Sequence, residues 1–112
     1  MVKIVNLTPH PINLSLQNNK RAEIPPSGIV ARVEEKTETI GKIQVGDGNI
    51  PVIRKTLGRV ENLPEPREDT IYIVSLIVAQ ALSGSRSDVY IIGESIRDEQ
   101  GRVIGAKSLA QL

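Results

Sequence analysis

IGKIQVGDGNIPVI, residues 40–53, contains the strongest turn signal of the chain. Its central Gly46-Asp47-Gly48-Asn49 lies between two stretches rich in Ile and Val, which is the pattern of a β-hairpin. One strand approaches the turn through Ile43 and Val45, and the other returns from Ile50 to about Thr56. Because glycine inside a strand favours an irregular backbone, Gly58 is expected to mark a bulge or bend. This hairpin indicates a fold built mainly from strands.

Similar patterns extend outward from this hairpin in both directions. Alternation of apolar and polar residues predicts strands at residues 12–16 and 29–33, and short apolar runs predict others. The charged residues 34–39 are expected to form a solvated edge or a loop, and the proline-rich residues 63–69 an exposed connection. Asp98 to Gly101 is the expected turn of a hairpin over residues 96–104. The remaining strands are expected at residues 2–7, 22–24, 70–74 and 88–92.

One short helix is expected after the buried strand at residues 70–74. Ser75 can cap a helix, and Leu76–Leu82 is about two turns long before Ser83-Gly84. The alternative is that this apolar run continues the strand, but residues 79–82 have low strand propensity. The connections between strands look too short for βαβ crossovers, which need a dozen or more residues each.

These elements predict a mainly β (α+β) fold of about eight short, mostly antiparallel strands with one short helix. We expect a single compact domain over residues 1–112, which is an ordinary domain length. The chain has no Phe and no Trp, so its core must consist of Ile, Val, Leu and Ala. Branched side chains of this kind pack well on a pleated sheet.

The composition argues against several classes of function. The chain has no cysteine, so disulfides, thiol-bound metal and a cysteine nucleophile are excluded. A net charge of +1 and only two tyrosines make nucleic acid an unexpected partner. The N-terminus lacks the pattern of a signal peptide, and no apolar run is long enough to span a membrane. We therefore expect a cytoplasmic protein without a metal site or a cofactor.

Several motifs resemble those of a family of small proteins encoded by bacteriophages, prophages and bacteria. The similarity rests on NLTPH at residues 6–10, IPPSG at 24–28, LPEP at 63–66, RSDVY at 86–90 and RDEQGRVIG at 97–105. It covers most of the chain, although Gly93-Glu94 stands where the family has a Pro-Gly pair. The family has no established biochemical function. The resemblance implies a bacterial cytoplasm, in a phage or a prophage context.

Five residues are candidates for a ligand-binding site, each with a structural alternative. His10 could act as a base or a ligand, because an imidazole titrates near neutrality. Its neighbours Pro9 and Pro11 instead favour a corner between two strands, since prolines cannot donate to a ladder. Arg86 could bind an anion, or form a loop salt bridge with its neighbour. The full set is Thr8, His10, Ser75, Arg86 and Asp88.

No catalytic constellation emerges from these residues. A nucleophile elbow needs glycine on both sides of the serine, and Ser75 has none. The sequence therefore favours a small non-catalytic binding protein that holds a small polar ligand, for example a nucleotide-derived one, or a protein partner such as a host protein. The alternatives are a small hydrolase or transferase with His10 as base, and a structural or assembly component of a phage particle. We further expect a homodimer, formed through the apolar helix and the leucines near the C-terminus.

Overall fold

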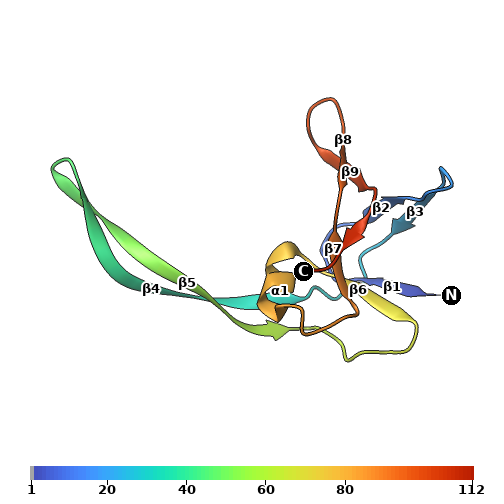
Figure 1. The fold of residues 1–112 in the computed structure, drawn as a ribbon, viewed down its shortest axis with the longest axis horizontal. Coiled ribbons are helices and arrows are strands. Elements are labelled where there is room, and N and C mark those ends of the chain that lie inside the picture. The colour runs from blue at the N-terminus through green and yellow to red at the C-terminus, as the bar shows by residue number, and fades with distance from the viewer. Residues whose placement is uncertain (1) are drawn as a thin grey trace.

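A long two-stranded arm extends from one side of the molecule. The structure, a computed structural model, describes residues 2–112, and Figure 1 shows the arm projecting far from the other elements. The molecule measures 59 × 39 × 23 Å. Its radius of gyration is 18.0 Å, whereas a compact chain of this length would have about 13 Å. The expectation of a compact shape is therefore wrong, because the arm lies outside the packed part.

The arm consists of β4 (Arg32–Val45) and β5 (Gly48–Glu61), which pair only with each other. We call residues 32–61 the arm and the rest of the described chain the body. Within the body, the strands are β1 (Lys3–Asn6), β2 (Ile12–Ser15), β3 (Arg21–Ile24), β6 (Thr70–Ile73), β7 (Val89–Ile92), β8 (Ser95–Arg97), β9 (Val103–Ala106) and β10 (Leu109–Ala110). The helix is α1 (Leu76–Leu82), so the prediction of one short helix is confirmed for the part of the chain described.

The first body sheet has the order β1-β6-β7-β10 and is largely parallel. β6 runs parallel to both β1 and β7, and only β10 is antiparallel to its neighbour. Between β6 and β7, residues 74–88 form a crossover that contains α1. The expectation that crossovers are absent is thus wrong, because this connection exceeds the dozen residues that a parallel pairing requires.

The second body sheet has the order β3-β2-β9-β8. Its two outer pairs are the predicted hairpins, β2 with β3 and β8 with β9, and both are antiparallel. Gly101 has a φ of 82° and donates its amide to the Asp98 carbonyl, which confirms the predicted turn. β2 and β9 pair in parallel at Leu14 and Ala106, so the sheets are mixed rather than mostly antiparallel.

The arm is longer and more regular than the sequence suggested. The predicted turn lies at Gly46 and Asp47, and Gly46 alone of the two has a positive φ, as in a type II′ turn. Residues 34–39, expected as an edge or a loop, lie within β4. The register shifts between Val33 and Glu35, where two β5 residues, Gly58 and Arg59, lie opposite Glu34. This confirms the bulge predicted at Gly58, and a second shift leaves Ile40 as an extra residue on β4.

The core lies on both faces of β6. Tyr72 and Val74 belong to one buried cluster, whereas Ile73 belongs to the other, and each of the three is at most 3% exposed. This agrees with the predicted central strand buried on both sides. The helix packs against β4, β5 and β7, with Val78 and Ala79 buried. The expected dimer was based on this helix and on the C-terminal leucines, of which Leu76 and Leu112 are 53% and 58% exposed, so it stays a prediction.

Candidate functional site

The corner after β1 is organised by a buried asparagine. The Asn6 side chain is 1% exposed. Its amide nitrogen donates to the carbonyls of His10 (2.8 Å) and Ile24 (3.1 Å). Its amide oxygen accepts hydrogen bonds from the Thr8 amide (2.9 Å) and the Thr8 hydroxyl (2.7 Å). The amide therefore uses both its donors and both lone pairs of its oxygen to hold the chain in this corner.

Thr8 and His10 are part of that corner. The Thr8 hydroxyl lies within hydrogen-bond distance of both the Asn6 oxygen and the His10 carbonyl (3.1 Å), so it is occupied locally. His10 takes part through its backbone carbonyl, and the residue is exposed. It borders an open hollow of about 430 Å³ between β2, β7 and β9, whose other walls include Ile92, Val103 and Ile104. In the described chain, no hydrogen bond involves the imidazole of His10, which borders this hollow.

Ser75 stands at the N-cap position of α1, as predicted. Its backbone is extended, with φ of −71° and ψ of 160°, but its hydroxyl makes no capping hydrogen bond. It borders a shallow hollow with Pro9 and with residues at the base of β4. Ser75 therefore begins the helix through its backbone conformation. The lining of its hollow includes the carboxylate of Glu35, but no hydrogen bond in the described chain joins that carboxylate to Ser75.

Arg86 and Asp88 form the salt bridge that the sequence left as an alternative. Nε and Nη2 of Arg86 donate to the two carboxylate oxygens of Asp88 at 2.9 and 2.8 Å. Nη2 also donates to the Pro64 carbonyl at 2.9 Å, and the Tyr72 hydroxyl donates to the Glu65 carbonyl at 3.0 Å. These contacts tie the connection at residues 63–66 to the start of β7.

The salt bridge also shifts the pKa values of Arg86 and Asp88. The hydrogen bonds from Arg86 hold the pKa of Asp88 below its usual value, although burial acts in the opposite direction. The same hydrogen bonds raise the pKa of Arg86, again against the effect of burial. Both side chains are mostly covered, with 20% and 17% of their surfaces exposed. The two parallel hydrogen bonds stabilise both residues in their charged forms. They also leave the Arg86 guanidinium little freedom to bind another anion.

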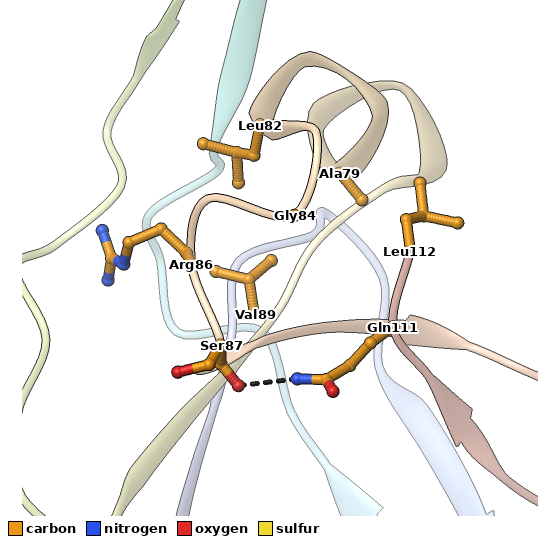
Figure 2. Close-up of a pocket in the computed structure, with 8 residues that line it drawn as sticks. All are labelled: Ala79, Leu82, Gly84, Arg86, Ser87, Val89, Gln111 and Leu112. Carbon is orange, nitrogen blue, oxygen red and sulfur yellow. Dashed lines mark hydrogen bonds between the residues drawn. The ribbon is translucent and has the colours of Figure 1, made fainter.

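Figure 2 shows the hollow that Arg86 borders, together with the end of α1 and the C-terminus. The guanidinium points away from Gln111 and Leu112, which lie on the other side. Across the hollow, the Gln111 amide donates to the Ser87 carbonyl at 2.6 Å. The volume is about 140 Å³, well below the roughly 300 Å³ at which small-molecule pockets begin. This hollow is too small for a nucleotide, and polar groups that border it are already hydrogen-bonded to other parts of the chain.

The five candidates therefore occupy three places. Thr8 and His10 share the corner, Arg86 and Asp88 share a salt bridge, and Ser75 begins the helix. No hydrogen bond among residues 2–112 joins one place to another, and His10, Ser75 and Arg86 border three different hollows. Arg86 also lies beyond the C-terminal end of α1, at the opposite end of the helix from Ser75.

The arm carries an uncovered apolar face that sequence reasoning did not select. In the register, Ile43 lies opposite Ile50, Gly41 opposite Val52, and Val45 opposite Gly48. Residues directly opposite share a face, so these six form one surface without a charge, which we call the tip face. Ile43, Val45 and Ile50 are 56%, 62% and 54% exposed. The available signal was the alternation of Ile43 and Val45 with Lys42 and Gln44, since alternating strands normally have one covered face.

Other kinds of site find no support in residues 2–112. They contain no group of three or more histidine or acidic side chains placed to hold a metal ion. None of the helices described in this part of the chain is long and apolar enough to cross a membrane. Comparisons with protein-family models, curated proteins and solved structures find no match to this chain.

Proposed function

We propose that this protein is a non-catalytic interaction protein that binds another protein chain through the tip face of its arm. The observation that carries the proposal is the tip face itself, six uncharged residues on a ribbon that nothing in the described chain covers. A two-stranded ribbon without a third strand or a packed face is at best marginally stable in water. A partner that covers this face would supply the missing burial.

The candidate residues support a binding role more than a catalytic one. The hydroxyl of Thr8 and the groups of Arg86 and Asp88 are engaged in bonds that hold the body together. The Ser75 hydroxyl is not hydrogen-bonded to Glu35, the carboxylate that lines the same hollow. A catalytic role would need a nucleophile or base paired with an orienting group. The side chains of His10 and Ser75 have no hydrogen-bond partner in the described chain, but they border different hollows and so do not form such a pair.

The resemblance to phage and prophage proteins extends the proposal to its setting. In this setting the protein acts in a bacterial cytoplasm, and the bound chain belongs to the host or to the phage. A loop or arm held by a packed scaffold is a usual place for binding residues.

A small polar ligand is the second candidate, and the hollow beside His10 is the observation in its favour. Its volume of about 430 Å³ is within the range of small-molecule sites, and His10 supplies an imidazole at its edge. Its walls are mainly apolar, and its polar side chains are those of His10 and Asn13. A ligand there would be held by fewer polar contacts than a nucleotide normally receives.

Two measurements on the purified chain separate these functions. Native mass spectrometry reports any bound protein chain, and mass spectrometry of the heat-denatured sample reports any released small molecule. We expect a bound protein chain that is lost in Ile43→Asp and retained in His10→Ala. A released metabolite that disappears in His10→Ala, or nucleotide turnover abolished by that change, would overturn the proposal.

A further inference from the structure

We infer that the chain covering the tip face is a second copy of this protein, with the two arms packed face to face around a twofold axis that runs along them. This inference rests on the proposed function and names its partner. It places the dimer contact on the arm, away from the helix.

The exposed area of the molecule points to a large missing contact. The described structure exposes 8340 Å². A compact monomer of 12.2 kDa exposes about 6,100 Å², so the excess is about 2,200 Å². A stable interface covers about 800 Å² on each partner, and obligate dimers cover more. The arm therefore provides enough surface for an obligate contact.

The tip face complements itself in size. A twofold axis along the arms places β4 of one copy over β5 of the other, at the same distance from the turn. Val45 then lies over the partner's Gly48, and Gly41 over the partner's Val52. Between these levels, Ile43 lies over the partner's Ile50. A large side chain thus meets a glycine at two levels, which lets the two faces approach closely.

The next level toward the body complements itself in charge. Glu38 lies opposite Arg54 within the arm. Arg54 is two residues from Val52 on β5, which has no register shift between them, so both belong to the same side of the ribbon. The same axis places Glu38 of each copy over the partner's Arg54. The charged level would fix the register of the apolar contact, because a slip along the arms separates the opposite charges.

The first test compares neighbouring residues on opposite sides of the arm. Light scattering after size exclusion should give the wild-type chain a mass about twice the 12.2 kDa of one copy. Ile43→Asp should raise the dimer dissociation constant about 30-fold or more, as expected for a central interface residue. Gln44→Asp is the matched control, because Gln44 is equally exposed but faces the other way, and it should leave the mass unchanged.

The second test reverses the charge of Glu38 in one variant and of Arg54 in another, and then mixes the two variants. Glu38→Arg and Arg54→Glu should each weaken self-association about tenfold or more at low salt, because like charges then meet across the axis. An equimolar mixture of the two variants should associate again, since opposite charges now face each other between copies. A merely structural role within one arm predicts no rescue on mixing. Failure of the mixture to associate more tightly than either variant would overturn the face-to-face arrangement.

The outcomes also separate this inference from the proposed function. A monomeric pure chain that binds a different protein through Ile43 would overturn the second copy as partner and leave the interaction role in place. A monomer that binds no protein would overturn both. Circular dichroism of each variant checks that the body remains folded, and the charge-exchange mixture does not depend on Ile43→Asp folding.

Discussion

Replacing Asn6 with alanine should destabilise the body more than any change at the exposed candidate residues. The substitution removes four hydrogen bonds from a side chain that is 1% exposed. Each such bond contributes a net ~0.5–1.5 kcal/mol, and water can reach some of the groups left behind because His10 and Ile24 are not fully buried. We therefore expect a loss of about 3 kcal/mol in the free energy of unfolding.

Urea denaturation followed by circular dichroism measures this loss directly. For a domain of this size, 3 kcal/mol corresponds to a fall in Tm of about 10–20 °C. Asn13→Ala is the matched control, since Asn13 is exposed and donates a single long bond of 3.4 Å to the Ile104 carbonyl. The control should stay within about 0.5 kcal/mol of wild type. If Asn6→Ala falls within that range as well, the corner does not depend on the asparagine amide.

Three further predictions concern other parts of the body. Asp88→Asn should be less stable than wild type at pH 7, and the difference should shrink below about pH 4. The reason is that the lowered pKa of Asp88 in the folded state gives stability that is lost as the pH falls through that pKa. Parallel acid-unfolding curves of the two proteins would contradict this. His10→Gln should change the free energy of unfolding by about 1 kcal/mol or less, since the side chain is exposed, and a larger change in urea would assign it a structural role. Gly93→Ala should cost about 1–3 kcal/mol in thermal denaturation, because the new Cβ would lie 2.5 Å from Ser108 Oγ, which accepts a bond from the Glu94 amide. The cost should fall in a Ser108→Ala background, and an unchanged cost there would place the strain elsewhere.

The local parts of the fold could be predicted because their causes lie within a few residues. The turn at Gly46 and the turn ending at Gly101 both require a positive φ that glycine adopts without strain. The helix at Leu76–Leu82 follows from its composition and from the serine before it. The strand at Thr70–Ile73 could be identified as buried because both of its faces are apolar.

The parallel pairings could not be predicted in the same way. β1 pairs with β6, and Leu14 of β2 pairs with Ala106 of β9, across most of the chain. Such pairings depend on which apolar faces find each other in three dimensions, and no residue near either strand encodes the choice. The charged residues 34–39 were expected as a solvated edge or a loop, and the structure places them in an exposed strand of the two-stranded arm, which is the first of these alternatives. In a two-stranded arm both faces can be solvated, so a strand there need not alternate.

In the candidate site, too, the local features could be predicted from the sequence and the long-range contacts could not. The corner at residues 8–11 and the Arg86–Asp88 salt bridge were both among the structural alternatives, and the structure places the residues in those roles. The organising role of Asn6 could not be inferred, because its burial depends on the carbonyl of Ile24 from another strand. The tip face was visible as a hairpin, but only the structure shows that no other part of the described chain covers it.

The way in which the arm is anchored makes its tip independent of the body. At its base, Val33 and Val60 are paired and pack against the buried cluster around Tyr72. Just above them, a Cβ at Gly58 would lie 3.3 Å from the Glu34 carbonyl, so the bulge brings the two backbones close together there. Beyond this point no arm residue belongs to either core cluster or packs against one. The apolar character of Ile43, Val45 and Ile50 therefore adds nothing to the packing of the body. An exposed ribbon that served only as a connection would be expected to carry polar residues on both faces. Around the turn, the face opposite the tip face carries Lys42, Gln44 and Asn49. The apolar character of the tip face there is best explained by a contact that the single chain cannot make alone.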